Sequence, residues 1–222
     1  MNIPNEIFRH AIPSEIYQKI NGDRGIGEQM DPKKMGMCME LISDYLSQEP
    51  NPTKKGWEDY YFSIQSKEPL IEASNYLINE LGIDQTNAKR YVYFRIIGQT
   101  WNGMVNEFRV IEQLQEKFPT IEFKKTDFKK DNELFTDWEG FTNSGELLFG
   151  IQVKPITYYF MGQDWQLKVK ESHKGKIQTY ENLYHVPHYM VYYDPDSSEV
   201  LFQFELYPSL EELLKSVGNE YH

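Results

Sequence analysis

Three side chains with complementary chemistry, Asp137, Gln152 and Lys154, fall within one predicted β-hairpin. Ser144-Gly145 is a turn signal between two strand-like runs. If these two residues form the loop, Asp137 lies directly opposite Gln152, and Lys154 follows two residues along the same face. That face then holds a carboxylate, an amide oxygen and an ammonium group. Such a set suits binding of an oxygen-seeking cation and stabilisation of negative charge.

The register of this hairpin depends on the length of its loop. A two-residue loop pairs Asn143 with Glu146, whereas a three-residue Asn-Ser-Gly loop shifts the register by one. The other face of the second strand is apolar and is the predicted core side, with Leu147, Phe149, Ile151 and Val153. A half-exposed hairpin with an ordinary surface Asp and Lys is the alternative interpretation.

Length and composition indicate one large domain, or one and a half. The chain has 222 residues, of which 40% are hydrophobic and 15% aromatic, enough for a packed core. Cys38 is the single cysteine, which excludes an intramolecular disulfide, a Cys-rich zinc site and a CxxC redox motif. We find no signal peptide and no apolar run near the roughly 18 residues that span a membrane. A cytoplasmic protein without a membrane partner is therefore expected.

The net charge of −11 argues at first against a nucleic-acid partner, but the charge is unevenly distributed. Residues 89–176 hold 14 Lys and Arg against 12 Asp and Glu, and the rest of the chain holds 9 against 22. The basic residues concentrate around the hairpin, in Lys124-Lys125, Lys129-Lys130, Lys168, Lys170, Lys174 and Lys176. A local basic surface of this kind permits a phosphate partner.

The order of elements changes near Trp101. Residues 1–100 are predicted mostly helical, with helices from Asp31-Pro32 to Gln48, from Glu68-Pro69 to Gly82, and over 88–97 with a break or bend near Gly98. An apolar stripe then predicts a helix ending at Phe118-Pro119. The following elements are predicted as a strand at 121–124, hairpin strands near 133–141 and 146–154, a helix at 173–184, strands at 188–193 and 200–204, and a last helix opened by the capping box at Ser209.

Glu107 lies on or beside the apolar stripe, in an early turn of the helix that precedes the strands. Buried acids need a partner, so a carboxylate there indicates either a functional group or a glutamate held by an arginine or a backbone amide. The spacing alone leaves both interpretations open.

Over residues 101–205 the chain resembles the catalytic core of the PD-(D/E)XK nuclease superfamily. Asp137 matches the first acid, Gln152-Val-Lys154 the acid-x-Lys motif, and Glu107 the helix glutamate. The run from Ile151 to Pro155 is similar to type II restriction endonucleases of the MjaI kind. The resemblance implies an α/β (α+β) fold with a mixed central sheet flanked by helices. It also implies a catalytic core over 101–222, preceded by a helical region over 1–100 for dimerisation or DNA recognition.

The resemblance implies a role for each matched residue. Asp137 and the Gln152 oxygen would hold Mg²⁺, with Glu107 binding it through water. Lys154 would orient or deprotonate the attacking water, or stabilise developing negative charge. Gln152 departs from the pattern because it replaces a carboxylate. This implies weaker metal binding or one metal ion, or a degenerate and non-catalytic nuclease fold.

The expected function is that of a Mg²⁺-dependent type II restriction endodeoxyribonuclease, acting as a homodimer on a short specific site in double-stranded DNA. The alternatives are a DNA repair or structure-specific nuclease of the same fold and a non-catalytic, nuclease-like binding protein. Glu139 is a reserve metal ligand. The candidates for DNA contact are Lys168, Lys170, Lys174, Lys176 and Tyr158, whereas His173, His185 and His188 lack a metal-binding spacing.

Overall fold

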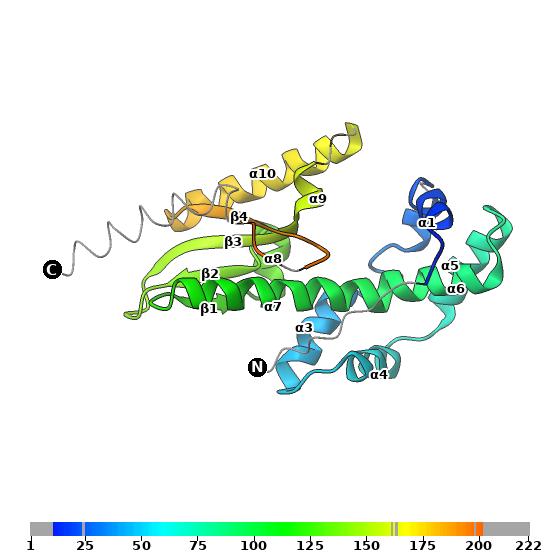
Figure 1. The fold of residues 1–222 in the computed structure, drawn as a ribbon, viewed down its shortest axis with the longest axis horizontal. Helices are drawn as coiled ribbons and strands as arrows, with labels where there is room; N and C mark the ends of the chain where they lie inside the picture. Colours follow the sequence, from blue (N-terminus) through cyan, green and yellow to red (C-terminus); the bar gives the residue numbers. More distant parts are fainter. Residues whose placement is uncertain (1–10, 24, 161, 163, 198, 202–222) are drawn as a thin grey trace. The chain divides into compact units, whose positions relative to one another are not determined.

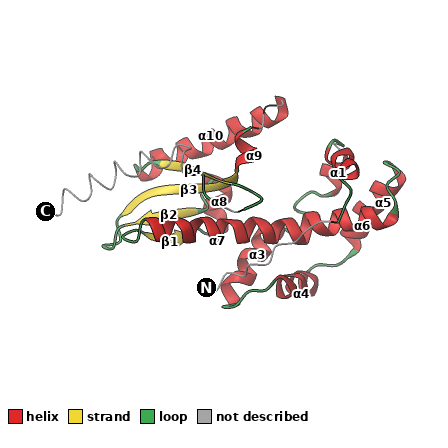
Figure 2. Ribbon diagram, viewed as in Figure 1, coloured by secondary structure: helices red, strands yellow, loops and turns green. Residues whose placement is uncertain are grey.

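The computed structural model describes residues 11–201 apart from positions 24, 161, 163 and 198. The chain forms two compact units, Met1–Val105 and Asn106–His222. The first unit is helical and the second holds a four-stranded mixed sheet with helices (Figures 1 and 2), which confirms the predicted α+β class. Among the described residues, no helix is both long enough and apolar enough to span a bilayer.

The first unit is built from short helices around buried aromatic side chains. Trp57 is fully buried and donates from Nε1 to the Ile97 carbonyl at 3.1 Å, while the Tyr61 hydroxyl donates to the Met35 carbonyl at 3.0 Å. The helices are α1 (Ser14–Asn21), α2 (Gly25–Gln29), α3 (Cys38–Gln48), α4 (Lys54–Ile64), α5 (Glu68–Asn79), α6 (Gln85–Tyr93), the π-helix η1 (Phe94–Gly98) and the start of α7 (Gln99–Lys117). The bonds of Trp57 and Tyr61 therefore join α4 to η1 and to the turn before α3.

Two helix boundaries in this unit differ from the prediction. Helix α3 begins at Cys38 rather than at Asp31, because Gly36 and Met37 adopt left-handed backbone angles, with φ of 73° and 53°. The helix predicted over 88–97, with a break or bend near Gly98, does not break there but contains a π-helical turn. The Gln99 amide donates to the Phe94 carbonyl, so the widened turn of η1 carries α6 into α7 without interruption.

The sheet of the second unit has the order β1-β2-β3-β4. Its strands are β1 (Glu122–Lys125), β2 (Trp138–Phe141), β3 (Leu147–Pro155) and β4 (His188–Tyr193). Strand β2 pairs with both β1 and β3 in antiparallel orientation, and β3 pairs with β4 in parallel orientation. Helix α7 runs along one side of the sheet and α10 (Asp164–Tyr184) along the other (Figure 1). Helix α10 is longer than predicted and follows the short α9 (Ile156–Tyr159).

Both faces of β3 are buried. Phe149, Ile151 and Val153 lie in one buried cluster with Val110 and Leu114 of α7, which confirms these three positions of the predicted core face. Leu147, the fourth, is only half-buried, and Leu148 joins the cluster instead. The opposite face, which was predicted to be polar, is covered as well. Gln152 on that face has 0% of its surface exposed. The alternative of a half-exposed hairpin is therefore wrong at this end of the strand.

The loop of the hairpin has three residues instead of two. The Thr142 amide donates to the Glu146 carbonyl at 2.9 Å, and Gly145 takes the left-handed conformation, with φ of 87°, that such loops require. The predicted pairing of Asn143 with Glu146 is therefore wrong. A β-bulge between Gly140 and Phe141 then shifts the register back by one residue. Trp138 consequently pairs with Ile151, where the ladder ends. Just beyond it the Asp137 carboxylate accepts a hydrogen bond from the Gln152 side chain, so the two side chains meet as predicted.

The segment before β2 forms a helix rather than the start of a strand. Helix α8 (Phe128–Leu134) begins after Asp127, whose side chain accepts a hydrogen bond from the Lys130 amide at 2.7 Å. It ends at Phe135, which has a left-handed φ of 56°. The Thr126 amide donates to the Asp137 carbonyl at 3.0 Å. The segment that joins β1 to β2 through α8 therefore begins and ends at positions that lie side by side.

The described chain after β4 contains one bridge, between Tyr193 and Val200. The rest of the strand predicted at 200–204 and the helix predicted from Ser209 lie outside the described residues.

We expect Gly150→Ala to lower the free energy of unfolding by about 1–3 kcal/mol. An added Cβ at Gly150 would lie 2.7 Å from the ring of Tyr180, which α10 packs against β3 and which is fully buried. Gly175→Ala is the control, because a Cβ there meets no atom within 4 Å and glycine disfavours a helix interior. Urea unfolding measures both variants. Equal stability of the two would contradict tight packing of α10 on the polar face.

Candidate active site at the end of the hairpin

Asp137 is a buried carboxylate held by the strand opposite it. Its side chain is 2% exposed, and its amide donates to the Ile151 carbonyl at 2.8 Å. Its Oδ2 atom accepts from the Val153 amide at 2.8 Å and from Gln152 Nε2. The second strand thus supplies two hydrogen-bond donors to this buried carboxylate.

Gln152 contributes a buried oxygen to the same place. Its Nε2 donates to Asp137, which leaves Oε1 buried and without a hydrogen-bond partner among the described residues. A buried carbonyl oxygen in this state is costly and marks a position where a further partner is favoured. An amide oxygen is a ligand type that hard cations accept.

Lys154 is the penultimate residue of β3 and lies half-buried at the strand end. Its Nζ atom is 5.0 Å from the centroid of the Phe135 ring, a cation–π contact. The Phe135 ring also stacks on His173, with centroids 3.9 Å apart. The ammonium therefore sits on an aromatic support beside the carboxylates, with part of its surface open to solvent.

Glu107 on α7 is 13% exposed and forms an ion pair with Lys125 of β1 at 2.7 Å. Its partner is therefore a lysine rather than the arginine or backbone amide that was considered. Burial raises the pKa of Glu107, and the Lys125 ammonium opposes this. For Lys125, burial favours the neutral amine, but Glu107 and Asp137 outweigh it and raise its pKa. Lys125 thus brings a second positive charge to the site, which the sequence analysis did not assign.

Asp131 on α8 is a further site residue that the sequence analysis missed. Its carboxyl group shares a hydrogen bond with that of Asp137. Burial and the neighbouring Asp137 charge raise the pKa of Asp131 to about 8. A sequence signal for it existed. Asp127 is a good helix N-cap, and the run from Lys129 to Leu134 suits a helix, but this segment was predicted to lead into a strand.

The reserve ligand Glu139 does not join this group. Both carboxylate oxygens of Glu139 accept from Lys130 Nζ, at 3.0 and 3.1 Å, and one also accepts from the Tyr180 hydroxyl at 2.8 Å. Glu139 therefore fastens α8 and α10 to β2. Glu146 lies exposed at the hairpin turn, at the opposite end of β3 from Lys154.

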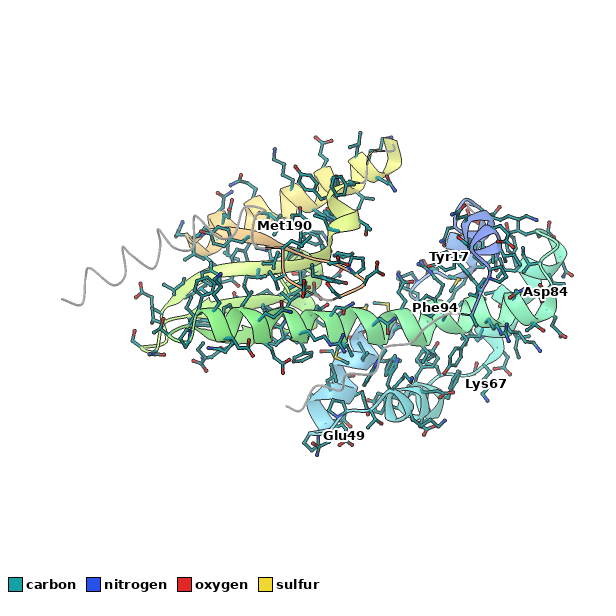
Figure 3. All side chains as sticks on the ribbon, in the orientation of Figure 1. Tyr17, Glu49, Lys67, Asp84, Phe94 and Met190 are labelled. Carbon is teal, nitrogen blue, oxygen red and sulfur yellow. The ribbon has the colours of Figure 1, made fainter. Side chains whose placement is uncertain are left out.

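A pocket of about 440 Å³ lies next to Lys154 on the α10 side of the sheet. Its lining includes Phe135, Tyr158, Lys170 and Lys174, together with Met190 of β4, which Figure 3 labels below α10. Aromatic rings and two lysines thus meet in one hollow that shares Phe135 with the site. Such a lining suits a base or a phosphate group.

The four candidate lysines of α10 differ in their surroundings. Lys170 Nζ donates to the Tyr159 carbonyl at 2.7 Å, and Lys176 Nζ donates to the Asn132 carbonyl at 2.5 Å. Lys170 thus binds α9, and Lys176 binds α8. Lys168 and Lys174 are exposed on the helix surface. The side chains of Lys168 and Lys174 are therefore more accessible to a phosphate backbone than those of Lys170 and Lys176.

The histidines take structural positions. Tyr158 and His173 Nδ1 share a hydrogen bond of 2.8 Å, and His188 Nε2 lies 2.9 Å from the Phe135 carbonyl. Burial lowers the pKa of both histidines to about 4, so both are neutral at pH 7. His185, with a left-handed φ of 57°, follows the end of α10.

The donor set fits a hard divalent cation when the amide oxygen is included. Within the described part of the chain, no three His, Cys, Asp or Glu side chains are grouped so that they could hold a metal ion. Asp137 and Asp131 supply two adjacent carboxylates, however, and Gln152 Oε1 is a third oxygen without a partner. Oxygen donors of these types match the preference of Mg²⁺.

The metal-free protein should lose stability as the pH rises through about 8, and Asp131→Asn should remove this loss. The pKa of Asp131 rises from 3.8 to about 8 on folding, so the folded state binds more protons between these values. Its contribution to stability is therefore complete below about pH 4 and disappears as the pH passes 8. Melting temperatures in EDTA from pH 5 to 9 measure the difference between wild type and variant. The exposed neighbour Glu133, changed to Gln, should follow wild type, and parallel curves for Asp131→Asn would refute the assignment.

Comparison with known proteins connects this geometry to a family. A family model described as MjaI restriction endonuclease matches residues 20–186, a segment that contains Glu107, Asp131, Asp137, Gln152 and Lys154. No curated protein and no solved structure matches the chain significantly. The family match covers well over half of the 222 residues, across both units. The chain belongs to the MjaI restriction endonuclease family.

Proposed function

We propose that the protein is a Mg²⁺-dependent type II restriction endonuclease that hydrolyses phosphodiester bonds at a short specific site in double-stranded DNA. The observation that carries this proposal is the buried contact of Asp137 with Gln152 at the strand end that presents Lys154. Membership of a restriction endonuclease family supports the same substrate.

Asp137 and Gln152 are the residues best suited to hold the cation. Asp137 is already fixed by two donors, and Gln152 Oε1 has no other partner among the described residues. Glu107, held by Lys125, would act through water. A divalent cation bound here would polarise the scissile phosphate and lower the pKa of a nearby water molecule.

Lys154 would complete the site from the strand end. Its half-buried ammonium rests on Phe135, which limits its movement but leaves it accessible to a phosphate. In this position it would orient the attacking water and stabilise negative charge that develops on the phosphate. An aromatic support cannot neutralise the ammonium, so its full charge is available to the substrate.

DNA contact beyond the reacting phosphate is proposed for α10 and for the first unit. Lys168 and Lys174 would contact phosphates, with Tyr158, Lys170 and Lys176 around them. The helical unit would supply recognition and dimer contacts. A homodimer suits a palindromic site because the two-fold symmetry of the protein matches that of the DNA.

The second candidate function is that of a non-catalytic DNA-binding protein with a nuclease fold. The observation that favours it is Gln152 in place of a carboxylate, which removes one negative charge from the place where the cation would bind. Cleavage of plasmid DNA separates the candidates. Discrete fragments in Mg²⁺ and none in EDTA indicate a type II enzyme, a smear or branch-specific cuts indicate a repair nuclease, and no cutting indicates the binding protein.

Lys154→Ala should lower the cleavage rate by at least about 100-fold, because a positive charge at the reacting phosphate has no substitute. The rate is measured on plasmid DNA in Mg²⁺, and circular dichroism checks the fold. Lys124→Ala is the matched control, since Lys124 is an exposed lysine on the same sheet that pairs with Glu122 at 3.1 Å. Unchanged cleavage by a folded Lys154→Ala protein would exclude Lys154 from the site.

Lys174→Ala should weaken DNA binding and reduce the salt dependence of binding by about one unit of slope, without lowering the melting temperature. Lys176→Ala should instead lower the melting temperature, because its ammonium binds the Asn132 carbonyl of α8. Binding is measured by fluorescence anisotropy in EDTA at several salt concentrations. If Lys176→Ala weakened DNA binding and Lys174→Ala lowered the melting temperature instead, the pocket side of α10 would not face the DNA.

A further inference from the structure

The proposed metal site has a deficit of negative charge in the hairpin itself. The position two residues before Lys154 holds an uncharged Gln152, so β2 and β3 together provide a single carboxylate there, that of Asp137. Divalent cations bind more tightly as the number of charged ligands increases. A site with one carboxylate and one amide would bind Mg²⁺ weakly, unless another element supplies charge.

The nearby carboxylates differ in what neutralises them. Glu139 is bonded to Lys130 and Tyr180, and Glu107 is paired with Lys125. Asp131 differs from both, because its hydrogen-bond partner is the carboxylate of Asp137. Asp137 is buried and Asp131 is half-buried. Carboxylates in contact repel each other, and a shared proton or a cation between them relieves this repulsion. Gln152, whose Nε2 donates to Asp137, adds a buried Oε1 without a described partner.

Helix α8 holds Asp131 in place from several sides. Its first turn is capped by Asp127, and its Asn132 carbonyl accepts from Lys176 of α10. The Phe135 carbonyl just beyond the helix is bonded to His188 of β4. Two of these tethers come from other elements of the second unit, α10 and β4. The position of Asp131 is thus fixed by the fold and not by the chance placement of a loop.

We infer that Asp131 is a ligand of the divalent cation and supplies the second carboxylate that Gln152 does not provide. This inference rests on the proposed metal-dependent function. The negative charge that the acid of the acid-x-Lys motif usually supplies then comes from Asp131 on α8, between β1 and β2. Gln152 still supplies an oxygen ligand.

The test measures Mn²⁺ binding in the absence of DNA, by electron paramagnetic resonance of the free ion. Asp131→Asn should weaken Mn²⁺ binding by at least about tenfold, because a charged ligand is lost. Glu133→Gln, on the exposed side of the same helix, should bind as wild type does. Asp131→Glu keeps the charge and should bind more tightly than Asp131→Asn. Melting curves in EDTA verify that each variant is folded.

A double variant tests the compensation itself. Asp131→Asn combined with Gln152→Glu restores two carboxylates and should recover most of the Mn²⁺ affinity. Wild-type affinity in Asp131→Asn alone would overturn the inference, as would a weakened variant that Gln152→Glu does not restore. If wild-type protein cleaves DNA in Mg²⁺ while Asp131→Asn binds Mn²⁺ normally, the inference fails and the proposed function stands. Failure of the wild type to bind Mn²⁺ would overturn both.

Discussion

The burial of Asp137 is the constraint on which the rest of the second unit depends. A carboxylate that is 2% exposed is tolerated only when its charge is satisfied. Here β3 supplies two donors, the backbone amide of Val153 and the side-chain amide of Gln152. Both bonds require that Asp137 lie opposite Gln152, so the charge and the strand register stabilise each other. A slip of one residue would place an apolar side chain against the carboxylate.

The same face of the sheet carries a second polar group with a different task. Lys130 and Tyr180 both donate to Glu139, and these bonds join β2 to α8 and α10. This group is neutralised within itself, and it keeps α10 in contact with the sheet. The group around Asp137 is not neutralised in this way, because Asp131 and Asp137 contact each other and a buried oxygen of Gln152 has no described partner. This difference distinguishes a structural ion pair from a candidate binding site.

The order of charges around the site also fits a phosphate substrate. Lys125 is paired with Glu107 and stays charged among carboxylates, whereas Lys154 lies half-buried at the strand end, on the ring of Phe135. Lys125 offsets the repulsion between the neighbouring carboxylates. Lys154 is placed to contact a ligand. Such a division is consistent with the restriction endonuclease family to which the chain belongs.

The sequence alone determined most of the helix-strand order, apart from α8 and α9, together with most of the core face of β3 and the approach of Asp137 to Gln152, because alternation and apolar spacing are local properties of the chain. It did not determine the three-residue loop or the bulge that restores the register, since two shifts of one residue cancel and leave no trace in the pattern. The contact of Asp131 with Asp137 was decided by tertiary structure. It depends on α8 folding back between two strands and on contacts from α10 and β4. Those contacts join residues far apart in the chain, and no local spacing encodes them.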